Sequence, residues 1–405
     1  MSASLPEGPE GAVSAASSHV AAYADELVAI RRDLHMHPEL GREEFRTTGL
    51  IHDRLVAAGL TPRLLPGTGV VCDIPASAGA ADGRGLIAFR GDIDALPVED
   101  AKDVPYRSTV PGRAHACGHD VHTTVTLGAG LVLADLAREG LLTRPVRLIF
   151  QPAEEKLPGG ALDVIKAGGL DGVEEIHAVH CDPRVEVGRV ALRVGAITSA
   201  CDRIIITLGG PGGHTARPHQ STDLVTALAK MAGELPSALA RRIDPRSGVS
   251  IVWGRINAGA APNVIPQRGE LDGTLRCLDI EAWRQAPDLI QELVDAIAST
   301  YGAKWELEHH RGVPPVVNDA DAVAAARTVA TGFLGAASVE VTEQSLGGED
   351  FSWFLEDVPG QLTRLGVRPV GEAPYDLHQG RFDVDEQAIG VGVRLFADLA
   401  LRPRQ

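Results

Sequence analysis

The sequence contains no hydrophobic run of 18 residues, so it predicts no membrane-spanning helix. It also lacks an excess of positive charge: 38 Lys and Arg residues stand against 54 Asp and Glu residues, a net charge of −16. This balance argues against binding to nucleic acid or to an anionic membrane surface. Only five cysteines are present among 405 residues, and they are scattered. Such usage is typical of a reducing compartment rather than of a disulfide framework, so we expect a cytoplasmic protein.

Residues 1–17 lack the basic start and the apolar middle of a secretory signal. They are rich in Ser, Ala, Gly and Glu, and they predict a disordered leader. The whole chain is 44% hydrophobic, which is enough for a large buried core in two or three domains.

Alternating helix and strand patterns dominate the first half of the chain. An apolar stripe at 3,4 spacing from Val20 to Leu34 predicts a helix that begins near Ser18 and ends before Pro38. A second helix is expected at about 42–58. Short apolar runs then predict strands at 69–74, 86–90, 146–151 and 176–180, with helices at about 123–138 and 160–167. This alternation predicts an α/β fold with a largely parallel sheet covered on both faces.

The pattern changes after about residue 196. Strands and helices are expected at 202–208, 222–239, 249–256, 269–276, 281–300 and 305–310. Their order, β-α-β-β-α-β, is that of a ferredoxin-like domain. The α/β pattern then resumes with elements at about 320–334, 361–366 and 385–401. We therefore expect a catalytic metal-binding domain of residues 18–196 and 312–405, into which residues 197–311 are inserted.

Metal-ligand residue types follow several of the predicted strands. Three of the apolar runs end in such residues or are followed directly by them. The residues are Asp92 and Asp94, the pair Glu154-Glu155, and His180. Because ligands bind beyond the carboxyl ends of parallel strands, these side chains are expected to converge. His180 alone would more often be a satisfied core histidine, and His378 alone carries no signal.

The stretch from His115 to His122 holds one thiol, three imidazoles and a carboxylate. A tight loop through Gly118 would let Cys117 and His119 bind one ion, and a thiolate beside an imidazole suits zinc and its divalent neighbours. The alternative is an ordinary helix start with spare histidines on a solvated face.

Adjacent acids such as Glu154 and Glu155 usually lie on solvated loops. After a buried strand and beside other ligands, they instead indicate a division of work, in which one coordinates an ion and the other is a general base. Asp92 and Asp94 are two residues apart in an extended segment, so both can face the same site.

Other chemistries fit the sequence less well. There is no Gly-x-Ser-x-Gly elbow and no His-Glu-x-x-His helix. The glycine-rich run before His214 lacks the P-loop lysine and the dinucleotide glycine spacing. A Cys117/His119 thiol hydrolase is conceivable, but it would leave Glu154, Glu155 and His180 without roles.

Taken together, the motifs resemble those of the metal-dependent N-acyl-amino-acid amidohydrolases. That group includes hippurate hydrolases and plant auxin-conjugate hydrolases, within the aminoacylase and carboxypeptidase G metallopeptidase superfamily. The matching segments are RRDLHMHPE (31–39), RGDIDALP (90–97), HACGHD (115–120), QPAEE (151–155), GHTARPH (213–219), NVIP (263–266), GTLR (273–276) and GEDF (348–351).

The resemblance implies a metallopeptidase-like catalytic domain with a mixed, largely parallel sheet, and an inserted ferredoxin-like dimerisation or lid domain. It implies a homodimer or a higher homo-oligomer. It also implies two divalent metal ions per subunit, zinc or manganese with cobalt or nickel as alternatives, held by Cys117, His119, Glu155, His180 and His378.

The same resemblance assigns roles to other residues. Glu154 is the implied general base, and His214 is the implied donor to the oxyanion, often across a dimer. Asn263 and Arg276 are implied to bind the substrate carboxylate, a task that suits a guanidinium fork. The wider superfamily has His-x-Asp where this chain has Asp92-Ile-Asp94, so we expect both aspartates to be supporting residues. A second departure is Cys181, which follows His180.

The expected activity is therefore hydrolysis of an N-acyl amino acid to a carboxylic acid and a free amino acid by metal-activated water. Related amides remain alternatives: a dipeptide, an N-carbamoyl amino acid or an aminobenzoyl-glutamate. A non-catalytic metal-dependent binding protein is the alternative of another class. Glu154 argues against it, because a pure binder needs no general base.

Overall fold

The computed structural model describes residues 9–79 and 81–403. The chain divides into two compact units, each described here by itself. The first unit comprises Met1–Gly195, Val317–Glu343 and Trp353–Gln405, and the second comprises Ala196–Val316 and Gln344–Ser352. The expected catalytic domain included residues 344–352, which here group with the second unit.

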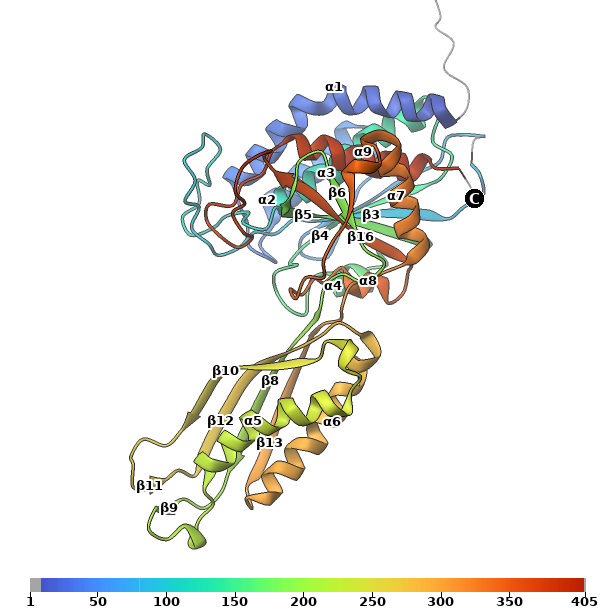
Figure 1. The fold of residues 1–405 in the computed structure, drawn as a ribbon. Helices are drawn as coiled ribbons and strands as arrows, with labels where there is room; N and C mark the ends of the chain where they lie inside the picture. Colours follow the sequence, from blue (N-terminus) through green and yellow to red (C-terminus); the bar gives the residue numbers. More distant parts are fainter. Residues whose placement is uncertain (1–8, 80, 404–405) are drawn as a thin grey trace, which may run out of the picture. The chain divides into compact units, whose positions relative to one another are not determined.

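The first unit is built on an eight-stranded mixed sheet (Figure 1). Its strand order is β1-β2-β4-β3-β5-β16-β6-β15. The pairs β3/β4, β3/β5, β5/β16 and β6/β15 are parallel, whereas β1/β2, β2/β4 and β6/β16 are antiparallel. The strands are β1 (Arg63–Leu64), β2 (Val70–Ile74), β3 (Leu86–Asp92), β4 (Val146–Gln151), β5 (Val173–Glu186), β6 (Val190–Leu192), β15 (Val339–Val341) and β16 (Gly360–Arg368). The predicted α/β class with a largely parallel sheet is confirmed.

Helices bury the faces of this sheet. Every residue of β4 is buried, as expected for a strand covered on both faces. The helices α1, α3 and α9 pack on one another, and α7 packs on α9 and β16. The helices of this unit are α1 (Pro9–Met36), α2 (Phe45–Ala57), α3 (His119–Arg138), α4 (Ala161–Lys166), α7 (Ala320–Leu334), α8 (Ser352–Leu355) and α9 (Gln387–Leu401).

Two expectations for this unit were wrong. The first helix begins at Pro9, so residues 9–17 are helical rather than a disordered leader, and residues 1–8 lie outside the described part of the chain. The small residues Ala12 and Ala16 are buried at 5% and 0% exposure and continue the apolar stripe, and alanine is the strongest helix former. The strand that was expected to end at His180 continues to Glu186, because β16 pairs with it up to Asp182 and, after an irregularity, again at Glu186.

A buried ionic cluster forms around Glu175 in β5. Its carboxylate accepts hydrogen bonds from His177 Nε2 at 2.8 Å, from Arg144 Nη1 at 3.0 Å and from Arg402. Burial alone raises the pKa of Glu175, but the hydrogen bond from His177 and the Arg402 guanidinium lower it by more. The net result is a pKa below the ordinary value.

The second unit is a four-stranded antiparallel sheet with the order β10-β12-β8-β13. Its strands are β8 (Ala200–Gly209), β10 (Ser250–Ala258), β12 (Arg268–Cys277) and β13 (Lys304–Val313), and two short strands, β9 (Gly213–His214) and β11 (Val264–Ile265), pair separately. The helices α5 (Leu224–Arg242) and α6 (Ile280–Thr300) bury apolar stripes that include Leu228 and Ile290. This strand order, with two helices, is the ferredoxin-like arrangement that the sequence predicts. The chain enters and leaves this unit near β7 (Gly195–Ala196) and β14 (Val317–Asn318).

Among the helices of the described residues, none is both long enough and apolar enough to span a bilayer.

Candidate metal centre

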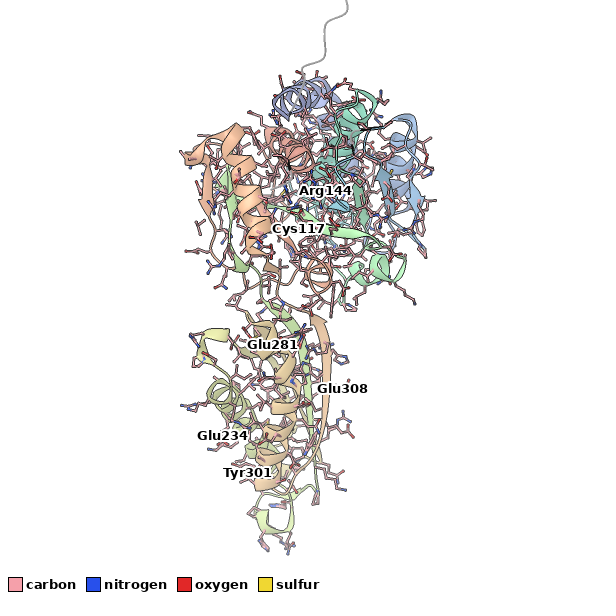
Figure 2. The ribbon with its side chains drawn as sticks, turned by 90° about the vertical axis from the view of Figure 1, so that its right-hand side faces the viewer. Cys117, Arg144, Glu234, Glu281, Tyr301 and Glu308 are labelled. Carbon is pink, nitrogen blue, oxygen red and sulfur yellow. The ribbon has the colours of Figure 1, made fainter. Side chains whose placement is uncertain are left out.

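Six candidate residues from four parts of the first unit place their metal-ligand atoms together. Three overlapping groups each have all ligand atoms within 4.8 Å of one another: Cys117, His119 and His180; Cys117, Glu155 and His378; and His119, Glu154 and Glu155. Cys117, labelled within the first unit in Figure 2, belongs to two of these groups. Its Sγ is 3.7 Å from His180 Nε2. Because two groups share Cys117, its sulfur would be available to more than one bound ion.

The loop before α3 presents Cys117 and His119 on either side of Gly118. Gly118 has φ of 87°, a left-handed conformation that side chains rarely adopt. A Cβ at this position would lie 2.7 Å from Cys181 Sγ and 2.9 Å from Cys181 Cβ. Only glycine therefore fits between the two candidate ligands.

Two further segments carry candidate ligands beside a strained backbone. His378 itself has φ of 62°, and its N–H donates to the carbonyl of Ala116 at 2.8 Å. Ala153, which precedes the glutamate pair, has φ of 53°. Such a conformation costs a non-glycine residue about 1–2 kcal/mol, and this kind of strain clusters at functional sites.

Hydrogen bonds fix which ring nitrogen of each histidine faces the centre. His119 Nδ1 donates to the backbone carbonyl of Asp94 at 2.9 Å, and it also lies 3.1 Å from Oδ1 of the Asp94 side chain. His180 Nδ1 donates to the carbonyl of Cys181 at 2.8 Å. Each histidine therefore keeps Nε2 as an acceptor, in the arrangement typical of metal-bound imidazoles.

The two aspartates of the 90–97 motif, Asp92 and Asp94, form hydrogen bonds around these histidines. Asp92 Oδ1 accepts from His122 Nδ1 at 2.7 Å, and its Oδ2 accepts from Arg90 at 2.6 Å. His122 Nε2 in turn accepts the N–H of Cys181 at 2.8 Å, so both of its nitrogens are engaged. Asp94 Oδ2 accepts the N–H of Glu155 at 3.0 Å. These contacts hold His119, His122 and the glutamate turn in place.

Burial and neighbouring charges shift several pKa values at this centre. Burial lowers the pKa of His119, but the Asp92 carboxylate and other neighbouring groups together raise it by more, so this imidazole must lose its proton when an ion binds. Burial and the Glu155 carboxylate raise the pKa of the Cys117 thiol well above its usual range. Burial and the Arg364 guanidinium lower the pKa of His180, which keeps its imidazole neutral. A divalent ion would supply the positive charge that converts a buried thiol to a thiolate.

Two buried polar atoms show where such ions would bind. Within the described residues, His119 Nε2 and Glu155 Oε1 are buried and make no hydrogen bond. Glu155 Oε1 lies 3.9 Å from His119 Nε2 and 3.3 Å from His378 Nε2. Sulfur, imidazole and carboxylate donors at these spacings fit a pair of divalent ions.

Three predicted residues, His214, Asn263 and Arg276, belong to the second unit. His214 in β9 pairs with Val264 of β11, directly after Asn263, so these two residues are neighbours. Arg276 is not a neighbour of these two residues. In the pairing of β12 with β8, Arg268 lies opposite Gly209 at one end and Arg276 lies opposite Cys201 near the other. A strand rises about 3.4 Å per residue, so Arg276 lies about 27 Å along β12 from Arg268. Arg268 is at the end of the sheet from which the chain continues to His214. Arg276 Nη1 donates to the carbonyl of Leu346.

Sequence reasoning gave no role to a buried cluster next to His119. Asp120 Oδ2 lies 2.8 Å from Arg31 Nε and accepts from His35 Nδ1 at 2.7 Å. This cluster ties the end of α1 to the start of α3. The signal was present in the sequence, because Arg31 and His35 share one motif and Asp120 follows a candidate ligand.

Cys181, the second departure from the family pattern, acts through its backbone. Its carbonyl and N–H orient His180 and His122, as described above, while its buried thiol packs against Gly118. Its sulfur belongs to none of the ligand groups found among the described residues.

Several known proteins are similar in sequence to most of this chain. A Rhodococcus jostii protein provisionally named glutamate–cysteine ligase 2-3 is 47% identical over 374 residues, 92% of this chain. The chain spans only 46% of that relative's length. An N-acetylcysteine deacetylase of Bacillus subtilis is 37% identical over 384 residues, covering 94% of this chain and 97% of the relative.

Among solved structures, a dinuclear metal-binding peptidase of the M20 family from Bacillus subtilis is 34% identical, with a TM-score of 0.80. The match covers 94% of this chain and 98% of that one. The model of peptidase family M20/M25/M40 matches residues 88–402. The resemblance to metal-dependent amidohydrolases is thereby confirmed, and the chain belongs to peptidase family M20/M25/M40.

Proposed function

We propose that this protein hydrolyses the amide bond of N-acyl amino acids with two divalent ions bound by Cys117, His119, Glu155, His180 and His378. The observation that carries this proposal is the set of overlapping ligand groups that share Cys117. The deacetylase names of the relatives support an N-acyl amino acid as the substrate class.

Glu154 is the proposed general base. Its Oε2 lies 3.9 Å from His119 Nε2, so it faces the ligand cluster from the residue next to Glu155. When bound, the two ions supply Lewis-acid polarisation of the substrate carbonyl and activation of water. Glu154 takes one proton from the water as its oxygen bonds to the carbonyl carbon, and it delivers that proton to the leaving nitrogen as the C–N bond breaks. The products are a carboxylic acid and a free amino acid.

His214, Asn263 and Arg276 are proposed to hold the substrate. Because Arg276 is about 27 Å along the sheet from the end near His214, one chain cannot place both on one small substrate. We therefore propose a homodimer in which one chain supplies Arg276 and His214 of the partner subunit donates to the oxyanion.

The cysteine ligand favours zinc among the candidate metals, with manganese, cobalt and nickel as the alternatives to test. A cytoplasmic location is proposed because all five cysteines are free thiols and four of them are buried.

A substrate and metal screen tests the proposal. Metal-stripped enzyme is reconstituted separately with zinc, manganese, cobalt or nickel, and is assayed on N-acyl amino acids. Dipeptides, N-carbamoyl amino acids and aminobenzoyl-glutamate are assayed in parallel. We expect N-acyl amino acids to have the highest kcat/KM and exhaustive chelation to abolish turnover. Full activity in metal-free enzyme would refute the mechanism, and a higher kcat/KM for another class would refute the substrate assignment.

A further inference from the structure

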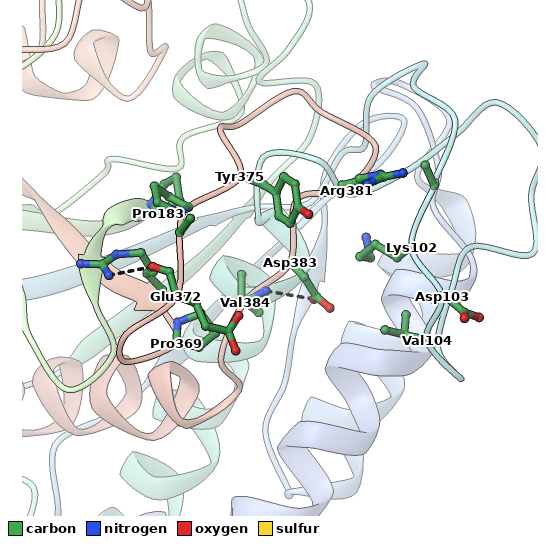
Figure 3. A pocket seen from close by; sticks show the side chains of 14 residues that line it. Lys102, Asp103, Val104, Pro183, Pro369, Glu372, Tyr375, Arg381, Asp383 and Val384 are labelled. Atoms are coloured by element: carbon green, nitrogen blue, oxygen red, sulfur yellow. Dashed lines mark hydrogen bonds between the residues drawn. The ribbon is translucent and has the colours of Figure 1, made fainter.

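Two segments that carry candidate ligands are held in place in different ways. His378 belongs to residues 368–384, which line a cavity of about 460 Å³ (Figure 3), and its N–H bonds to another backbone group. The glutamate turn, residues 153–155, is instead held by the side chain of Glu44 at the start of α2. Glu44 belongs to none of the ligand groups found among the described residues.

The carboxylate of Glu44 is buried, with 0% of the residue exposed. Its Oε1 accepts the backbone N–H of Ala153 at 2.8 Å, and its Oε2 accepts the hydroxyl of Thr68 at 2.6 Å. Glu44 is the N-cap residue of α2, but its side chain makes no capping hydrogen bond. The carboxylate of Glu39 accepts two backbone N–H groups of the first turn of α2 instead. The Glu44 side chain therefore bonds to the glutamate turn rather than to its own helix.

The contact between Glu44 and the turn lies where the backbone is strained. Among the described residues, three that are not glycine have a left-handed backbone: Arg42, Ala153 and His378. Arg42 follows Gly41, where an added Cβ would lie 3.0 Å from Ala153 Cα. Two of the three strained residues therefore lie at one contact. Such strain persists only where the surrounding structure over-determines the conformation, and it clusters at functional sites.

Further bonds close the same contact. Arg42 Nη1 donates to Asp163 Oδ2 at 2.6 Å, which ties the loop before α2 to α4. The carbonyl of Ala153 accepts the N–H of Gly160 at 3.0 Å, so both backbone polar groups of Ala153 are bonded. Loss of the Glu44 acceptor would leave a buried N–H without a partner. Relaxation of the strained Ala153 would then move the two glutamates that follow it.

We propose that Glu44 is a positioning residue for the hydrolysis. Its side chain holds Ala153 in the left-handed conformation, and this conformation directs Glu155 toward the ligand cluster and Glu154 toward the reacting water. The inference rests on the proposed function, which identifies Glu155 as a ligand and Glu154 as the base. The hydrogen-bond acceptor of Glu44 is what matters, because its partner at Ala153 is a neutral N–H.

Zinc titration of metal-stripped variants tests this proposal. Glu44→Met fills the same space without a hydrogen-bond acceptor, whereas Glu44→Gln retains one. Competition with a chromophoric chelator gives each zinc dissociation constant. We expect Glu44→Met to weaken zinc binding by about tenfold or more, the equivalent of one buried polar group left unpaired, and Glu44→Gln to stay within about threefold of the unchanged protein.

The matched control is Glu39→Met. Glu39 is also a glutamate that accepts two backbone N–H groups near the start of α2, but neither belongs to the glutamate turn. This variant should keep its zinc affinity and kcat even where its stability is lower. In steady-state assays on an N-acyl amino acid, Glu44→Met should lower kcat by about tenfold or more with a smaller change in KM, because displacement of the base slows the chemical step.

Relief of the strain at residue 153 gives a separate test. Glycine adopts a left-handed backbone readily, so Ala153→Gly in the Glu44→Met background should raise kcat by about fivefold or more, the equivalent of the strain on a left-handed alanine. A role of Glu44 in packing alone would give no such recovery. If Glu44→Met does not fold, Glu44→Asp takes its place, because its shorter side chain withdraws the acceptor from Ala153, and the same losses are expected.

Unchanged zinc affinity and kcat in Glu44→Met would overturn the proposal. Losses of equal size in Glu39→Met or in Glu44→Gln would also overturn it. Failure of the proposed function gives a different result: no form of the protein would hydrolyse an N-acyl amino acid, while zinc binding would still depend on Glu44. That outcome would refute the activity and leave the positioning of Glu155 standing.

Discussion

Replacement of Gly118 by alanine should destabilise the first unit by about 2–5 kcal/mol. The left-handed backbone at this position, with φ of 87°, costs an alanine about 1–2 kcal/mol. The added Cβ would also lie 2.7 Å from Cys181 Sγ, and overpacking of a buried site costs about 1–3 kcal/mol. The two contributions arise from different causes, so they can be measured separately.

Gly112 provides the matched control for the backbone contribution. It has φ of 71°, and nothing lies within 4 Å of a Cβ built there, so Gly112→Ala should show the backbone cost alone. Urea unfolding of the chelated proteins gives each free energy of unfolding. The excess cost of Gly118→Ala over Gly112→Ala should fall when Cys181 is replaced by glycine, in a double-mutant cycle. Equal costs for the two alanine variants, or no coupling to Cys181, would refute the reasoning.

Further predictions concern the active-site residues and pH. Glu154→Gln should keep both ions and lower kcat by about 10²–10⁴-fold, whereas Glu155→Gln should lose metal; near-normal turnover in both would contradict their roles. His214→Ala should lower kcat by about 10²–10³-fold with little change in substrate affinity, measured by steady-state kinetics. Arg276→Ala should chiefly raise KM, and should have much less effect on a substrate whose carboxylate is amidated. Because the pKa of Glu175 is below its ordinary value of 4.5 in the folded state, its contribution to stability is complete above that value and declines as pH falls below it. Glu175→Gln should therefore reduce the loss of unfolding free energy between about pH 5 and pH 3, and an unchanged acid limb would refute this.

The elements with a single strong pattern were predictable from the sequence. The strand at 146–151 has the expected limits because its short, mainly apolar run is flanked by Pro145 and Pro152, a pattern typical of a buried strand. The extension of β5 beyond His180 was not predictable, since His-Cys-Asp-Pro reads as the end of a strand. Only the neighbouring strand β16, which pairs Leu365 with Cys181, shows why the strand continues.

The candidate metal centre, like the fold, was only partly predictable from the sequence. Residue types predicted that Cys117 and His119 could bind one ion, and the family resemblance added His180. The structure brings the ligand atoms of all three within 4.8 Å of one another. The ring nitrogen that each histidine offers could not be predicted, because the backbone carbonyl of Cys181 and that of Asp94 decide it. The roles of these residues in catalysis stay predictions.

The spread of the candidate ligands along the chain has a consequence for the order of folding. Cys117 and His378 lie on opposite sides of the whole inserted unit in sequence, yet they belong to one ligand group. These two ligands become neighbours only when the first unit has folded, so the complete group does not exist in the unfolded chain. We therefore expect the sheet to assemble before the ions bind. In this respect the protein is the opposite of a zinc finger, whose metal creates the fold.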